Sequence, residues 1–118
     1  FFARVEGFEF VEQSVTSINN ASRVAISAST SGGAIITISV PEDVVAGTYN
    51  FDNVSYTGQY MLTSPNVVAT VADSGSVTIT AHDTDARTME GTFSFVSSPI
   101  GATEPVYNIT EGSFSISY

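Results

Sequence analysis

The sequence contains no cysteine, no lysine and no tryptophan. The absence of cysteine excludes disulfide bonds, thiol catalysis and thiolate metal sites. Charged residues make up only 13% of the chain. No apolar run approaches the ~20 residues that a membrane-spanning helix needs, so we expect a domain that does not span a membrane.

Positive charge is especially scarce. The basic residues are Arg4, Arg23 and Arg87, and twelve acidic residues oppose them, so the formal net charge is −9 at pH 7. A chain of this charge repels nucleic-acid phosphates and anionic membrane surfaces at long range. We therefore expect no nucleic-acid partner.

The residues that are abundant favour one β domain. A length of 118 residues suits a single domain over residues 1–118, and the 42% of apolar residues, with eight Phe and five Tyr, can fill one core. Serine and threonine dominate the polar fraction, and a threonine-rich, lysine-poor surface suits strands better than helices.

Apolar residues alternate with polar ones along much of the chain, and a helical period persists nowhere. Residues 1–5 and 8–11 read as a hairpin that turns at Glu6-Gly7. Residues 22–29 and 34–40 are predicted to form an antiparallel pair. One short helical turn is predicted over residues 42–46, after Pro41.

The second half of the sequence continues this pattern. Strands are predicted over residues 54–62 and over 67–71, the latter ending at 73–75. A hairpin follows, with its turn over 82–87, and the last pair of strands is predicted to turn at Glu111-Gly112. The inward residues of these later strands are predicted to be Val77, Ile79, Ala81, Phe93, Phe95, Phe114, Ile116 and Tyr118.

About eight to ten short strands, with turn signals roughly every 8–12 residues, predict an all-β fold. The expected architecture is a two-layer antiparallel β-sandwich. A partly closed β-barrel is the alternative, since small barrels show the same alternation.

Four segments also carry a family resemblance. They read Phe-Phe-Ala-Arg-Val-Glu-Gly-Phe-Glu-Phe at the start, Val-Pro-Glu-Asp-Val-Val-Ala-Gly-Thr-Tyr in the middle, Gly-Ser-Val-Thr-Ile-Thr with Gly-Thr-Phe-Ser-Phe later, and Ile-Thr-Glu-Gly-Ser-Phe-Ser-Ile near the end. The chain resembles a family of small envelope lipoproteins and secreted domains of Bacteroidota whose function is undefined. The resemblance implies an extracellular or cell-surface domain that follows an upstream signal sequence. It implies no active site.

Catalytic chemistry has little support in the sequence. His82 is the only histidine, and the residues around it match no nucleophile motif. We therefore expect no enzyme activity.

Asp83 and Asp85, beside His82, are candidate ligands for calcium, and no other cofactor is expected. The alternative is that these aspartates stabilise a hairpin turn through bonds to nearby amides.

Tyr56, Tyr60 and Tyr107 are candidates for a carbohydrate-binding face, because their rings offer stacking area with a polar tip. The alternative is that they are half-buried strand residues.

The lack of lysine points to a different role. Exposed sheet edges are usually protected by lysine, proline or inward charges, and several predicted strands here carry no charge at all. Either these strands are all internal, or one edge pairs with another chain. We expect a terminal strand to pair with a second copy or with another surface protein. The candidate interaction residues are Phe1, Phe2, Val5, Phe114, Ile116 and Tyr118.

The sequence thus predicts a non-enzymatic surface domain with a structural or protein-interaction role, such as a self-assembling filament or adhesive subunit. The alternative function is a carbohydrate-binding module that uses exposed tyrosines and calcium.

Overall fold

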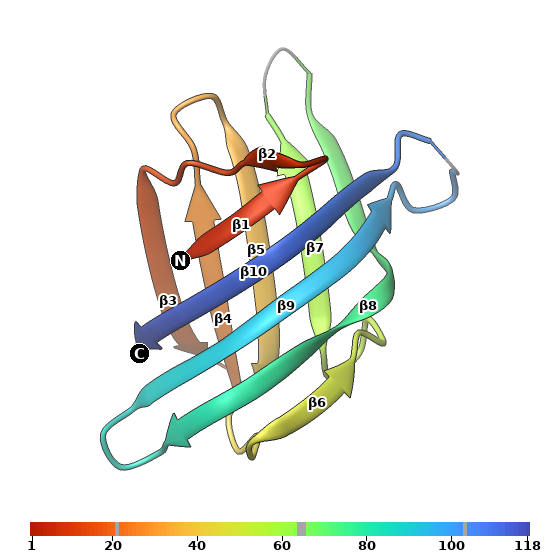
Figure 1. Cartoon of the computed structure of the whole chain (residues 1–118). Helices are drawn as coiled ribbons and strands as arrows, with labels where there is room; N and C mark the ends of the chain where they lie inside the picture. Colours follow the sequence, from red (N-terminus) through yellow and green to blue (C-terminus); the bar gives the residue numbers. More distant parts are fainter. Residues whose placement is uncertain (21, 64–65, 103) are drawn as a thin grey trace.

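The computed structural model describes residues 1–20, 22–63, 66–102 and 104–118. Within these residues ten strands form one antiparallel sheet (Figure 1). The strands are β1 (Phe2–Val5), β2 (Phe8–Glu9), β3 (Ser14–Asn20), β4 (Arg23–Ser29), β5 (Ala34–Pro41), β6 (Gly47–Asn50), β7 (Thr57–Leu62), β8 (Val68–Asp83), β9 (Thr88–Ser98) and β10 (Tyr107–Ser117). In the residues that the structure describes, no helix is long and apolar enough to cross a membrane.

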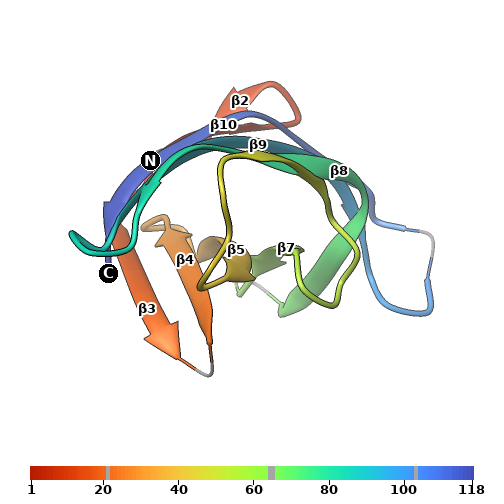
Figure 2. The ribbon, with the colours of Figure 1, turned by 90° about the horizontal axis from the view of Figure 1, so that it is seen from below.

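The strand order is β2-β1-β10-β9-β8-β7-β5-β4-β3, and β6 pairs with β8 off this path. The sheet curls strongly along this order and forms a half-barrel, which Figure 2 shows from below. The all-β prediction is therefore confirmed, but the two-layer sandwich is wrong. The partly closed barrel was the better alternative.

The sandwich prediction failed because β8 is one long strand. Its first part pairs with β7, its second part pairs with β6, and β9 pairs with it on the other side from Val71 to Asp83. The strand therefore carries the sheet around the curl without a break. Alternation alone cannot distinguish this arrangement from two stacked sheets, because both put every second side chain inside.

Bulges in β8 produce the bend. The register of β8 against β9 shifts between Ala72 and Ser74 and again between Ile79 and Ala81. At each shift, β8 contains one extra residue that has no partner on β9. The side chains that follow therefore point to the opposite face from the one that simple alternation predicts. Ala81, which simple alternation predicted to face inward, is therefore exposed. Residues 73–75 continue the strand and do not end it, contrary to the prediction.

A bulge in β10 has the same effect on the other side of β9. The register shifts between Ile109 and Gly112, so two residues of β10 stand opposite Ser94 alone. Glu111 lies in this bulge with φ of 52°. The predicted hairpin turn at Glu111-Gly112 is wrong, because β10 runs through it as one strand. Tight turns and β-bulges both favour glycine, so a glycine-containing pair fits either.

The first half of the sequence was predicted more closely. The turn at Glu6-Gly7 joins β1 and β2 as expected, with both residues at positive φ. The predicted pair over residues 22–29 and 34–40 is β4 with β5. The helical turn expected over 42–46 is an irregular turn, closed by a bond from the Val44 amide to the Pro41 carbonyl.

The interior of the half-barrel holds the core. Among the described residues, nineteen hydrophobic side chains are buried there. The largest fully buried ones are Ile26, Ile36, Ile38, Ile79, Met89 and Ile109.

The two ends of the open sheet lie near each other. Residues 10–13 connect β2 at one end of the strand order to β3 at the other, and Phe10 of this segment is buried in the core. Farther along, the Ser17 hydroxyl of β3 donates a 2.6 Å hydrogen bond to the Ser117 carbonyl of β10. The gap in the barrel is therefore crossed by a chain segment and by one side-chain hydrogen bond.

Candidate functional site

The first candidate site is the free edge of β3. Within the part of the chain that the structure describes, this strand pairs only with β4, so its other side carries backbone amides and carbonyls without a strand partner. Its seven residues, Ser-Val-Thr-Ser-Ile-Asn-Asn, include no charge, proline or glycine. The edge therefore lacks the usual features that prevent pairing with another chain.

Apolar side chains lie on both faces of this edge. Val15 is 40% exposed and stands opposite Ala28, a core residue, so it lies on the inner face. Ile18 is 58% exposed and stands opposite Ala25 on the outer face. An added strand would thus find apolar contacts above and below its backbone.

Strand β3 was not predicted. Its residues are mostly polar, and its apolar residues are Val15 and Ile18. These two are three positions apart, so they do not fit an alternating pattern. The β-branched residues Val15, Thr16 and Ile18 were the signal that could have identified the strand.

The predicted interaction residues of the first strand do not lie on a free edge. Strand β1 pairs with both β2 and β10, so it is not a free edge. The rings of Phe1 and Phe93 lie 5.6 Å apart, and Arg4 lies over the ring of Phe2. Val5 is half-buried against the core.

The predicted residues of the last strand also pack inward. Phe114 is buried, and Ile116 and Tyr118 are half-buried against the core. β1 pairs with β10 only as far as Ser113, so residues 114–117 have β9 as their strand partner. This part of β10 lies beside β3, at the bond from Ser17 to Ser117.

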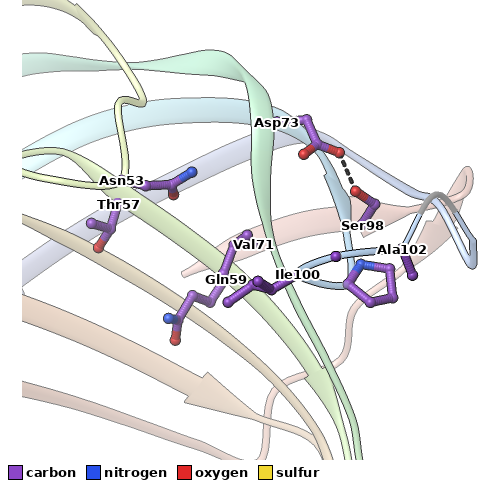
Figure 3. A pocket seen from close by; sticks show the side chains of 10 residues that line it. Asn53, Thr57, Gln59, Val71, Asp73, Ser98, Ile100 and Ala102 are labelled. Carbon is purple, nitrogen blue, oxygen red and sulfur yellow. Dashed lines mark hydrogen bonds between the residues drawn. The ribbon is translucent and has the colours of Figure 1, made fainter.

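The second candidate site is a groove of about 680 Å³ on the outer face of β7, β8 and β9. Gln59, Val71 and Ser98 stand opposite one another on these three strands and form its floor. Pro99 and Ile100, from the connection that follows β9, lie over it. Figure 3 shows Val71, Gln59 and Ile100 between Asn53 and Thr57 at one end and Ala102 at the other.

A bulge orients the acidic group of the groove. Asp73 is the residue of β8 that the shift between Ala72 and Ser74 leaves without a partner on β9. Its carboxylate accepts a short hydrogen bond from the hydroxyl of Ser98, drawn as a dashed line in Figure 3. Ser98 is only 7% exposed, so packing holds its side chain in place.

The loop that carries Asn53 is held from both sides. The Asp52 carboxylate accepts hydrogen bonds from the amides of Val54, Ser55 and Tyr56. These bonds lower the pKa of Asp52, and the bond from the Tyr56 amide has the largest effect. The side chain of Asn53 itself donates a 2.9 Å bond to the Ala72 carbonyl.

Arg23 binds backbone carbonyls of the same loop. Its guanidinium donates to the carbonyl of Val54 at 2.9 Å and to that of Ser55 at 2.7 Å. It also donates to the hydroxyl of Ser39 on β5. The loop beside the groove is therefore fixed to the sheet before any ligand arrives.

The structure does not bring the three predicted tyrosines to one face. Tyr60 is 6% exposed inside the half-barrel, with its ring 4.8 Å from that of Tyr107, and burial, followed by Tyr107, raises its pKa. Tyr56 lies elsewhere, stacked at 4.6 Å on Tyr49. Tyr60 faces inward because it shares a face with the buried Gly58 of the same strand.

The predicted calcium ligands belong to the turn between β8 and β9. One carboxylate oxygen of Asp83 accepts bonds from the amides of Asp85 and Ala86, both at 3.0 Å. Among the residues that the structure describes, no group of three or more acidic, histidine or cysteine side chains could hold a metal ion. The hydrogen bonds of Asp83 are those of a turn aspartate.

His82 makes two hydrogen bonds that occupy both ring nitrogens. Nδ1 lies 2.7 Å from the Val44 carbonyl and therefore carries a proton, and Nε2 lies 2.5 Å from the Tyr118 hydroxyl, which donates to it in the neutral ring. These contacts connect β8, the turn after β5 and the end of β10.

The groove residues Asn53, Gln59, Asp73 and Ser98 were not predicted from the sequence. They lie far apart in the sequence, and only the curl and the bulge in β8 bring them together. The one local signal was the aspartate of residues 73–75, which was interpreted as part of a turn.

Fold and groove together define an all-β half-barrel domain with a polar groove on its outer face. The chain belongs to the family described as Domain of unknown function (DUF6252), which matches residues 8–116. No curated protein and no solved structure matches the chain.

Proposed function

We propose that this protein is a non-enzymatic surface domain with a structural or protein-interaction role, and that it pairs with a second copy of itself through β3. The observation that carries the proposal is the uncharged, seven-residue free edge of that strand. Adding a strand there satisfies the open backbone groups and covers Val15 and Ile18.

A second copy fits this edge for an electrostatic reason. The chain carries a net charge of −9, so most surfaces of two copies repel each other. Ser14–Asn20 contributes no charge, and pairing there avoids direct contact between like charges. In an antiparallel pair centred on Ser17, Thr16 of one copy faces Ile18 of the other, a favourable pair of β-branched residues.

The environment of the single histidine, His82, supports a non-enzymatic role. Its two ring nitrogens bind a backbone carbonyl and a tyrosine hydroxyl, and neither partner is a carboxylate that orients a general base. The location outside the cytoplasm is supported by the resemblance to envelope lipoproteins and secreted domains. Labelling of intact source cells with a membrane-impermeant reagent tests this location.

Sedimentation velocity from about 1 µM to about 1 mM protein tests the pairing. The wild type is expected to form a dimer as the concentration rises. Ile18→Lys places a charge on the free edge and is expected to leave the protein monomeric. Thr92→Lys adds the same charge to the exposed outer face of the central strand β9 and should associate like the wild type.

A wild type that stays monomeric over the whole range contradicts the proposal. So does an Ile18→Lys variant that dimerises as strongly as Thr92→Lys. Circular dichroism of both variants confirms that the sheet is intact.

A further inference from the structure

We propose that the groove on the outer face of β7, β8 and β9 binds a neutral carbohydrate. This inference is independent of pairing through β3, because the groove and that edge involve different strands.

The groove has the size of a small-molecule site. Its volume of about 680 Å³ falls within the roughly 300–1,000 Å³ that such sites occupy. It lies on the outer face and is open to solvent, so a ligand that continues beyond it, such as an oligosaccharide, can be accommodated.

The polar groups of the groove suit hydroxyl groups that both donate and accept. Asn53 and Gln59 each offer an amide donor and a carbonyl acceptor, Thr57 offers a hydroxyl, and Asp73 offers carboxylate acceptors. Adjacent hydroxyls on a sugar ring need such a mixture. Val71 and Ile100 provide apolar surface for the C–H face of the ring.

Two of these polar groups are fixed in advance. One carboxylate oxygen of Asp73 accepts the hydroxyl of Ser98, which leaves the other oxygen for a ligand. Asn53 is held by its bond to the Ala72 carbonyl, within the loop that Asp52 and Arg23 stabilise. Groups that are already oriented lose little entropy when a ligand binds.

Charge selects against other ligand classes. Among the described residues that line the groove, Asp73 is the one ionisable side chain, and it is acidic. Phosphorylated and carboxylated ligands are therefore repelled. A single carboxylate is also a poor site for calcium, because a calcium ion usually takes six to eight oxygen ligands.

The test uses the whole chain on an array of neutral oligosaccharides, followed by calorimetric titration of each sugar that binds. Asp73→Asn is expected to raise the Kd roughly tenfold or more, because the lost partner is charged, and Gln59→Ala is expected to raise it by about threefold to tenfold. Matched controls are Asp85→Asn, which removes the same charge from the β8–β9 turn, and Gln13→Ala, which removes an exposed amide elsewhere. Both controls should bind like the wild type.

Four results would overturn the proposal. The first is that no neutral oligosaccharide binds at concentrations up to about 10 mM. The second is that a sugar binds equally well to Asp73→Asn. The third is that binding depends on calcium and is lost in Asp85→Asn, which places the sugar at the turn. The fourth is that the tripeptide Gly-Arg-Gly binds more tightly than any sugar, which makes the groove a site for basic peptides. Urea unfolding of each variant shows whether a lost affinity reflects a lost fold.

Discussion

Phe93 on β9 lies directly opposite Gly112 on β10, and its ring occupies the space that a Cβ atom on Gly112 would need. The next inward pair reverses the arrangement, with Gly91 on β9 opposite Phe114 on β10. The rings of Phe93 and Phe114 are stacked, with centroids 6.3 Å apart. Each ring therefore lies against the backbone of the neighbouring strand, beside the bulge of β10.

Gly112→Ala is expected to lower the free energy of unfolding by about 1–3 kcal/mol, because the new methyl group would overlap the ring of Phe93. Urea denaturation measures the change. Gly32→Ala is the control, since its Cβ would lie 3.8 Å from the nearest atom, a side-chain oxygen of Thr30. The control should change stability by less than about 1 kcal/mol. Equal effects from the two substitutions would show that the ring does not constrain Gly112.

Thr70→Val is expected to cost about 1–3 kcal/mol of unfolding free energy. The buried hydroxyl of Thr70 donates to the Tyr60 carbonyl at 2.6 Å and lies 2.9 Å from the hydroxyl of Ser97. Valine has a similar shape but leaves these buried groups without a partner. The exposed Thr92→Val is the matched control, and the prediction fails if chemical denaturation gives both variants the same stability.

Asp52 is expected to make stability depend on pH. Its pKa is lowered in the folded protein by the amides of Tyr56 and its neighbours. The ionised carboxylate therefore stabilises the fold fully above its unfolded pKa of about 3.9, and this contribution is lost as the pH falls through the lowered folded pKa. Urea unfolding at several pH values should show that Asp52→Asn is less stable than the wild type at neutral pH. The difference should shrink in acid, and a constant difference contradicts the assignment.

Arg23→Lys is expected to lower the unfolding free energy by about 1–2 kcal/mol, because one ammonium group cannot replace the three directed bonds of the guanidinium. Calorimetric melting measures the loss. Amide exchange of Asn53 and Val54 should also become faster, since the loop carbonyls lose their partner. Arg4→Lys is the control: its exposed ion pair with Glu111 spans 2.7 Å, and such a pair contributes at most about 1 kcal/mol. A similar loss in both variants would argue against a special role for Arg23.

Alternation in the sequence predicted many of the buried residues correctly. Val77 and Ile79 face the core as predicted, as do Phe93 and Phe95. These residues lie in strands without bulges between them, where each side chain points opposite to the one before.

The pattern failed where a strand contains an extra residue. Ala81 follows such a residue, and nothing in the local composition distinguishes a bulge from a turn at residues 73–75 or at Glu111. The candidate sites were missed for a related reason. The groove residues become neighbours only after the sheet has curled, and the free edge of β3 is a property of the strand order.

The pairing of β1 with β10 also governs the order in which the domain can be made. Glu6 and Asn108 are hydrogen-bonded to each other across 102 positions of sequence, so the first hairpin finds its neighbour only after nearly all of the domain has left the ribosome. Contacts of such long range slow folding. The nascent chain therefore stays incompletely folded until β10 emerges, an interval during which chaperones can engage it.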